Sequence, residues 1–429
     1  MNMKVLVLDL THGGEVLARE YLRRGNQVTA VDIYRTAGET ARSLSAEGAR
    51  ILPAAPDERF DLAVAPVHSP DRFIGKAVAD RKLTHHQAVG ELTSFPYPVV
   101  EVTGVRGKTS TVRVLSFLMA SEGRKVLCLS SSGLSRYDGE EKVLEDKVSI
   151  APPTLLRLSS SPTDVDLGIF EVSLGGTGIG KVSVITGLQE DYPIAAGTRR
   201  AFDGKSQMAE SARGVLIIPK GEEETWRPLA RRCRRMVTFG KGGDVEAEVS
   251  NAALGSPSLL TVRTGRGERE VPLQPSFLPD AYTLAFSCAL AAAEGLDLDP
   301  LEICSSLSGF PGARGRAEVL VDERGEMVRE RNPGVCTASL DFLIERMVRE
   351  HGCRDIGLVL DPVNIKVCEK LDLERMAEMC ERHPQVTGRY ILPSGVRAGG
   401  SQLFEPIGDV DEVRTRHRTV LWATKEGYL

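Results

Sequence analysis

A glycine-rich loop between an apolar strand and a helix constrains this chain more than any other segment. The run Val99–Thr103 is apolar and leads into a loop that ends in Gly107-Lys108-Thr109. Apolar residues at helical spacing follow, and Gly123 marks a stop. Such a turn points backbone N–H groups at an anion, and the helix N-terminus adds partial positive charge. The segment therefore predicts a nucleotide-phosphate loop with a Mg²⁺-binding hydroxyl. An ordinary strand–turn–helix with a surface lysine is the alternative.

Composition limits the classes of protein to consider. The chain has 429 residues, of which 41% are hydrophobic, and this is enough for about three packed domains. A net charge of −5 gives no electrostatic footprint for nucleic acid, and no apolar run approaches the ~20 residues that span a bilayer. The eight cysteines are dispersed, as expected for free thiols in a reducing compartment. We expect a cytoplasmic protein that binds neither nucleic acid nor membrane.

The beginning of the chain has the pattern of a Rossmann-like unit. Lys4–Leu8 and Val28–Val31 are predicted parallel strands with a helix between them. The turn Thr11–Gly14 has two glycines and does not complete G-x-G-x-x-G. It is therefore expected to face a ligand other than a dinucleotide, or to be a close packing corner. The adjacent His85 and His86 stand in a polar stretch and are expected to be solvated.

The loop after the apolar strand departs from the general phosphate-loop pattern, because Val102 stands where that pattern has a glycine. Its form, Thr-Gly-x-x-Gly-Lys-Thr-Ser-Thr, instead resembles the Mur ligase superfamily. Those enzymes use ATP to turn a carboxylate into an acyl phosphate, which a nucleophile then attacks. The resemblance implies an ATP-dependent ligase that uses Mg²⁺ and releases ADP and phosphate. The nucleotide contacts that it implies in this loop are Thr103, Gly104, Val105, Arg106, Gly107, Lys108, Thr109, Ser110 and Thr111.

The resemblance covers most of the chain and implies an α/β fold with a three-domain Mur-ligase-like architecture. We expect an N-terminal Rossmann-like domain over 1–95, which holds the carboxylate substrate. A central P-loop ATPase domain is expected over 96–315, and a small C-terminal α/β domain over 316–429. The Gly/Pro-rich segment Gly309–Gly315 is the expected hinge before the last domain.

Several oxygen-bearing residues are candidates to hold metal. Glu171 ends a predicted strand, where ligands of open α/β sheets bind, and has the Glu-x-Ser context of the family; a glutamate facing solvent is the alternative. The family's Asp-His pair, whose histidine helps to bind a second metal ion, is replaced here by Asp191-Tyr192. Tyrosine is a poor Mg²⁺ ligand, so Asp191, Gln189 or Glu190 would have to compensate. The Mg²⁺ ligands that the resemblance implies are Thr109, Glu171 and Asp191.

Four further positions match, or replace, functional positions of the family. Lys205 is a candidate for the carbamylated lysine that some members use as a metal ligand; a plain lysine is the alternative. Arg316 lies in a linker similar to the family's Gly-Arg-x-Glu and would reach the γ-phosphate, unless it is only a surface arginine. The family's adenine-binding asparagine is missing near Tyr282, so the base contact must differ and Tyr282 is its candidate. Asn332 remains from an Asp-x-Ala-His-Asn-Pro turn. The expected catalytic residues are Lys108, Glu171, Lys205 and Arg316.

The missing family residues argue against a routine peptidoglycan ligase. The opening Val5–Gly14 and the nucleotide loop resemble the branch of this superfamily that completes coenzyme F430 in methanogenic archaea. That resemblance implies a nickel tetrapyrrole substrate, the seco-F430 acid. One propionate would be activated by ATP and attacked by a carbon of the same macrocycle, which closes a carbocyclic ring.

Only the resemblance indicates a tetrapyrrole substrate. We also expect the protein to be a monomer. Three alternatives remain open: an amide-forming ligase that adds an amino acid to a carboxylate, a non-enzymatic nucleotide switch, and a dinucleotide oxidoreductase.

Overall fold

The computed structural model describes residues 2–160, 164–188, 191–250, 253–332, 334–362, 371–392 and 403–425. The chain forms two compact units. Unit 1 consists of Met1–Asp244 and Ala291–Leu298, and unit 2 of Val245–Leu290 and Asp299–Leu429. The chain therefore passes between the units three times. None of the described helices has the length and apolar character needed to cross a lipid bilayer.

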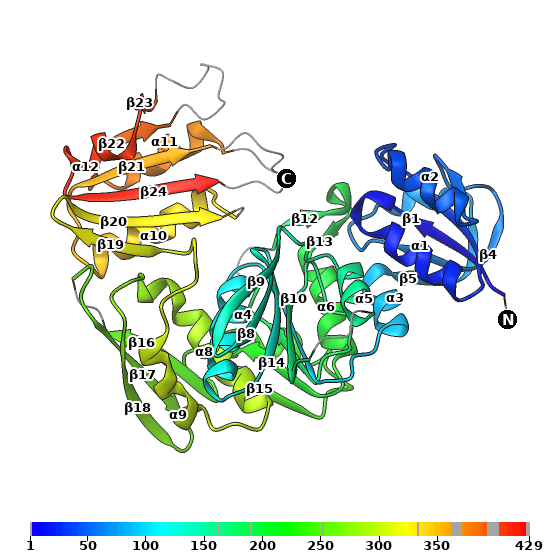
Figure 1. Cartoon of the computed structure of the whole chain (residues 1–429), viewed down its shortest axis with the longest axis horizontal. Coiled ribbons are helices and arrows are strands. Elements are labelled where there is room, and N and C mark those ends of the chain that lie inside the picture. Colours follow the sequence, from blue (N-terminus) through cyan, green and yellow to red (C-terminus); the bar gives the residue numbers. More distant parts are fainter. Residues whose placement is uncertain are drawn as a thin grey trace. The chain divides into compact units, whose positions relative to one another are not determined.

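Unit 1 begins with a five-stranded, fully parallel sheet in the order β3-β2-β1-β4-β5 (blue in Figure 1). Its strands are β1 (Lys4–Leu8), β2 (Gln27–Val31), β3 (Arg50–Leu52), β4 (Arg59–Ala65) and β5 (Val78–Thr84). Its helices are α1 (Gly14–Arg23), α2 (Gly38–Ala46) and α3 (His85–Leu92). The chain runs outward from β1 through β2 to β3, and then returns to the other side of β1 with β4. The strand order thus reverses between β1 and β4, and open α/β sheets bind ligands at such a point.

A second sheet of unit 1 carries the nucleotide loop. Its parallel strands lie in the order β15-β14-β11-β6-β10-β7, and the antiparallel β8 and β9 follow β7 at the edge. The strands are β6 (Val99–Thr103), β7 (Val126–Ser130), β8 (Gly133–Asp138), β9 (Glu140–Asp146), β10 (Leu167–Glu171), β11 (Val182–Ile185), β14 (Val215–Pro219) and β15 (Arg235–Phe239). The short β12 (Pro193–Ile194) and β13 (Arg199–Arg200) pair separately. The helices are α4 (Lys108–Ser121), α5 (Pro153–Ser159), α6 (Ala201–Ser211) and α7 (Glu223–Trp226).

The two sheets of unit 1 share a hydrophobic core. Leu17 of α1, Leu155 of α5 and Phe170 of β10 are fully buried members of one cluster. Strands β6, β7 and β10 are buried along their whole length, as expected of parallel strands with both faces covered. This shared core places the carboxyl ends of the two sheets within one compact body.

Unit 2 contains an antiparallel meander and a second mixed α/β layer. The meander is β16 (Val245–Ser250), β17 (Ser258–Thr264) and β18 (Gly267–Leu273). Helices α8 (Thr283–Gly295) and α9 (Pro300–Ile303) follow it, and one crossing between the units lies inside α8.

The last sheet has the order β19-β20-β24-β21-β22-β23. Its strands are β19 (Glu318–Asp322), β20 (Gly325–Asn332), β21 (Ile356–Asp361), β22 (Val386–Ile391), β23 (Glu405–Pro406) and β24 (Thr419–Lys425). Its helices are α10 (Thr337–Arg349), α11 (Leu373–Arg382) and α12 (Val410–Arg414). The predicted α/β architecture, with Rossmann-like, P-loop and small α/β parts, is confirmed; the proposed divisions at 95 and 315 stay predictions.

Candidate active site

The predicted phosphate loop lies between β6 and α4, and two of its positions require glycine. Gly104 has φ +143° and Gly107 has φ +80°, a region that other residues rarely adopt. A Cβ on Gly104 would lie 1.9 Å from Thr186 Oγ1. Thr186 also holds the loop, because its amide donates to the Thr103 carbonyl at 2.9 Å and its hydroxyl to the Arg106 carbonyl at 2.5 Å. The segment after β11 therefore fixes the shape of the loop.

The remaining loop residues lead directly into α4. The Val105 amide donates to the Gly187 carbonyl at 3.0 Å, and the Thr111 amide donates to the Gly107 carbonyl at 2.8 Å. Ser110 lies half-buried in the first turn of α4. This first turn presents the positive end of a 14-residue helix, which favours an anion beside Gly107.

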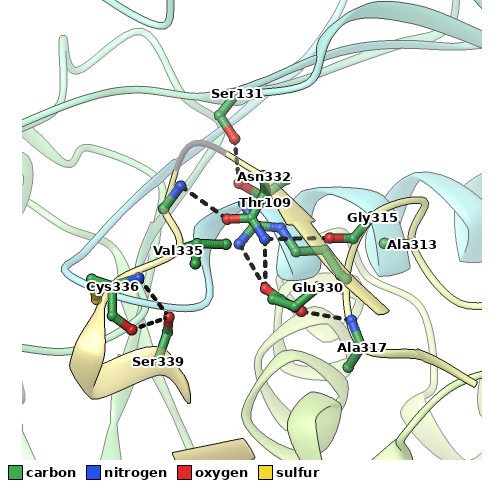
Figure 2. A network of polar contacts seen from close by, with 12 residues as sticks. Thr109, Ser131, Ala313, Gly315, Ala317, Glu330, Asn332, Val335, Cys336 and Ser339 are labelled. Carbon is green, nitrogen blue, oxygen red and sulfur yellow. Dashed lines mark hydrogen bonds and ion pairs between the residues drawn. The ribbon is translucent and has the colours of Figure 1, made fainter. Parts of the chain in front are cut away.

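Three oxygen-bearing side chains meet beside the loop lysine. Thr109 Oγ1 donates to Glu171 Oε2 at 2.8 Å and lies 2.9 Å from Ser131 Oγ; Figure 2 shows the contact between Thr109 and Ser131. Lys108 Nζ is 3.9 Å from Glu171 Oε1. Glu171 is only 2% exposed, so the alternative of a solvent-facing glutamate is wrong. A carboxylate with two hydroxyls is a hard-oxygen set of the kind that Mg²⁺ prefers, so these residues fit that ion.

Lys205 points into the interior from α6. It has no exposed surface, and no hydrogen-bond partner of its Nζ is found in the described ranges. Its ammonium lies 5.5 Å from the centre of the Tyr192 ring. Burial, and then the positive charge of Lys108, lower the pKa of Lys205 to about 8. A substantial fraction of this side chain is therefore the neutral amine near pH 8, which is the form that can react as a nucleophile.

Asp191 contacts the same helix. Its Oδ2 accepts from Arg200 Nε at 2.5 Å, and its Oδ1 accepts from the Phe202 amide at 2.9 Å at the start of α6. Although burial raises the pKa of Asp191, the hydrogen bonds from Arg200 and Phe202 bring it below the ordinary value. The carboxylate thus orients the helix that carries Lys205. Gln189 and Glu190, the other candidates for a second metal, lie outside the described residues.

Two site candidates of unit 2, Arg316 and Asn332, contact a buried network around Glu330. The Ala317 amide donates to Glu330 Oε2 at 2.7 Å, and Asn332 Nδ2 donates to Glu330 Oε1 at 2.5 Å (Figure 2). Arg316 Nη1 lies 3.8 Å from the same carboxylate. Asn332 Oδ1 accepts from the Gly334 amide at 2.9 Å. The network fixes the start of the last sheet and places Arg316 and Asn332 at one carboxylate.

Tyr282 is buried among aromatic side chains. It is 1% exposed, its hydroxyl donates to the Arg316 carbonyl at 2.8 Å, and it accepts from the Ala313 amide at 2.9 Å. Its ring packs with three phenylalanines, Phe277, Phe286 and Phe310. Tyr282 therefore anchors the linker that precedes the last sheet, and its predicted adenine contact stays a prediction.

The expectation that His85 and His86 are solvated is wrong. Both are 2% exposed at the start of α3. His85 Nε2 lies 3.2 Å from the Leu8 carbonyl, and His86 Nε2 lies 2.7 Å from the Ser173 carbonyl. Burial lowers the pKa of His85 to about 3 and that of His86 to about 4, so both are neutral. They connect the first sheet to the loop after β10.

Sequence reasoning missed three polar residues. Glu101 is fully buried in β6, and its carboxylate accepts from Thr177 and from the Gly178 and Gly180 amides at 2.6–3.3 Å. Ser131 and Glu330 were missed as well. For Glu101 the available signal was an acidic residue inside an otherwise apolar strand, which is tolerated only when several donors meet it; Ser131 and Glu330 have no such signal.

Comparison with known proteins shows which class of protein has this fold and this phosphate loop. A MurF ligase from Thermotoga maritima in complex with ADP shares the fold with a TM-score of 0.57 at 14% identity, over 93% of this chain and 91% of that one. The coenzyme F(430) synthetase of Methanosarcina acetivorans is 30% identical over 426 residues, covering 90% of each chain. With the phosphate loop described above, these similarities define an ATP-dependent ligase of the Mur type.

A second relative gives the same result. The coenzyme F(430) synthetase of Methanocaldococcus jannaschii is 22% identical over 407 residues, covering 88% of each chain. No protein-family model matches the sequence. The chain belongs to the Mur ligase superfamily.

Proposed function

We propose that this protein closes a carbocyclic ring on a nickel tetrapyrrole, the seco-F430 acid, to give coenzyme F430. ATP would activate one propionate as an acyl phosphate, and a carbon of the same macrocycle would displace the phosphate. The observation that carries this proposal is the 30% identity to a coenzyme F(430) synthetase over 90% of both chains. The nickel would arrive inside the substrate. We further propose a cytoplasmic monomer.

The roles proposed for residues of unit 1 follow from their chemistry. The loop from Thr103 to Thr111 would bind the phosphates of ATP through its amides, and Lys108 would neutralise their charge. Thr109 and Glu171, already 2.8 Å apart, would hold Mg²⁺ with Asp191. When bound, that ion would offset negative charge on the phosphates.

Lys205 is proposed to carry a carbamate. Its burial and lowered pKa, about 8, favour the neutral amine, which adds to CO₂ with loss of one proton to solvent. The carbamate would replace a buried positive charge by a carboxylate that can bind metal. Intact mass after incubation in bicarbonate would show the added group. A native-mass measurement that finds only the unmodified lysine would refute this part alone.

In unit 2, Arg316 is proposed to reach the γ-phosphate, and Asn332 and Tyr282 to line the nucleotide site. Arginine suits this role because its fork matches phosphate oxygens and keeps its charge. The Gly309–Gly315 hinge would let the last domain, proposed to begin at residue 316, complete the site.

The test is incubation of the full-length protein with ATP, Mg²⁺ and the seco-acid. We expect loss of one water from the substrate, with one ADP and one phosphate formed for each ring closed. Phosphate release that requires an added amino acid would support the amide-ligase alternative. This alternative is favoured by 24% identity over 374 residues to a UDP-N-acetylmuramoylalanine–D-glutamate ligase of Desulfosudis oleivorans. ATP turnover without any acceptor would support a nucleotide switch.

A further inference from the structure

A buried carboxylate and two imidazoles meet where the strand order of the first sheet reverses. Asp9 follows β1, His12 ends the short helical turn after it, and His68 follows β4. One ligand atom from each of these side chains lies within 4.8 Å of the others. The edge between β1 and β4 is the position at which an open α/β sheet binds its ligand. The three side chains therefore stand in the expected substrate crevice of the N-terminal sheet.

Asp9 determines which ring nitrogen of the neutral His12 carries the proton. Its Oδ2 lies 2.7 Å from His12 Nδ1, and its Oδ1 accepts from the amides of Thr11 at 3.1 Å and His12 at 3.2 Å. Asp9 is fully buried and has φ +67°, a conformation that non-glycine residues seldom adopt without compensation. Because this carboxylate accepts at Nδ1, the neutral His12 ring carries its proton there and its lone pair at Nε2.

The His12 ring is accessible. Its side chain is 47% exposed, whereas that of Asp9 is 0% exposed. The groups around it are Asp9, His68 with its ring 5.1 Å away, Tyr34 with its ring 5.5 Å away, and Glu15. The hydrogen bond to Asp9 raises the pKa of His12, while burial lowers that of His68. An exposed imidazole oriented by a buried carboxylate is the arrangement of a general base.

The loop that carries His68 packs against the helix of Lys205. Arg199 Nη1 donates to the Val67 carbonyl at 3.1 Å, and a Cβ on Gly204 would lie 3.5 Å from Val67. The positive charge of Lys108 in turn contributes to the lowered pKa of Lys205. The imidazoles thus lie in the same compact unit as the phosphate loop, and the neighbour of His68 packs against the residue that precedes the buried lysine.

We propose that His12 Nε2 accepts the proton of the carbon nucleophile, with Asp9 as its positioning residue; this inference rests on the proposed function. The C–H bond breaks, and its electron pair forms the new C–C bond to the acyl carbon. The acyl C–O bond then breaks, and phosphate leaves with that electron pair. The imidazolium returns its proton to water or phosphate.

The experiment separates proton removal from activation. The full-length protein is mixed with the seco-acid in D₂O without ATP, and deuterium uptake at the nucleophilic carbon is followed by mass. With ATP, Mg²⁺ and hydroxylamine, trapping of the hydroxamate reports acyl phosphate. We expect His12→Gln to lower both exchange and ring closure about 100-fold while hydroxamate formation stays within about threefold of wild type. Asp9→Asn should also lower the rate of deuterium exchange at the nucleophilic carbon.

The matched control is His383→Gln, because His383 also pairs with an aspartate, Asp341 at 2.6 Å, but in unit 2. It should leave exchange unchanged. Exchange and closure by His12→Gln within threefold of wild type would overturn the inference. So would exchange that a chelator abolishes, because the three side chains would then act through a metal. If wild type forms neither product nor hydroxamate from the seco-acid, the proposed function itself fails, and this inference falls with it.

Discussion

Lys205 shows at the scale of one residue how a buried charge affects stability. Its pKa is near 8 in the folded protein against 10.5 for an ordinary lysine. Below pH 8 the side chain is charged in both states, so folding must bury the ammonium. Between pH 8 and 10.5 the unfolded chain binds more protons, and stability rises with pH. Lys205 therefore costs stability at neutral pH, and this cost fades in alkali.

We predict that Lys205→Met stabilises the protein at pH 7 in carbonate-free buffer. A shift of this size corresponds to roughly 3 kcal/mol, so the melting temperature should rise by several degrees. The gain should shrink as the pH rises from 8 toward 10.5. Thermal melts across this range measure it, with the exposed Lys241→Met as the control. A gain that grows with pH would contradict the prediction.

A second residue-scale prediction concerns Lys108. Lys108→Ala should lower ATP-dependent product formation about 100-fold or more, because a fixed phosphate-binding cation is lost. The melting temperature should change little, since this side chain packs no core. Lys220→Ala removes a surface lysine paired with Glu223 and should leave activity unchanged. Activity of Lys108→Ala within threefold of wild type, well under 1 kcal/mol of barrier, would sink the assignment.

At the scale of elements, Glu101 joins β6 to the turn after β10. Its carboxylate accepts four hydrogen bonds from three residues of that turn. We predict that Glu101→Ala costs roughly 2–4 kcal/mol of unfolding free energy, because buried donors lose their acceptor. Denaturant unfolding measures this cost. Glu270→Ala, on the exposed face of β18, is the strand control. Equal effects of both changes would refute the claim.

The apolar strands could be predicted from sequence, but several polar elements could not. Lys4–Leu8 and Val99–Thr103 are strands with those bounds, because a short, mostly apolar run bounded by turn residues is typical of a buried parallel strand. The meander β16–β18 alternates buried apolar residues such as Val245, Leu260 and Val271 with exposed polar ones, a pattern typical of half-buried strands that the sequence analysis did not use. His85 and His86 were misjudged because their burial depends on carbonyls of Leu8 and Ser173, which are distant in sequence.

Some residues of the candidate site could likewise be predicted from the sequence, and others could not. Lys108, Thr109 and Glu171 could be predicted because a loop and a strand end fix them locally, and the structure brings them together. The Asp9–His12–His68 group could not be predicted, because it forms only when β1 and β4 become neighbours. The spacing of these residues in the sequence does not show that β1 and β4 pair.

At the scale of the whole molecule, bound nucleotide should stabilise the fold. We predict that MgADP at 100 times its dissociation constant adds about 2.7 kcal/mol of stability, seen as a higher melting temperature. Lys108→Ala should lose most of this shift at the same nucleotide concentration, whereas Lys220→Ala should keep it. An equal shift in wild type and Lys108→Ala would place the nucleotide elsewhere.

The three passages of the chain between the two units have a consequence for how this protein can be cut or recombined. Neither unit is one continuous stretch, and the crossing between residues 290 and 291 lies inside α8. One protease nick therefore cannot release an intact unit, and no single gene fragment encodes either. A swap with a related ligase at the crossing between residues 290 and 291 would divide α8. A single crossover therefore cannot exchange one whole unit and leave the other intact.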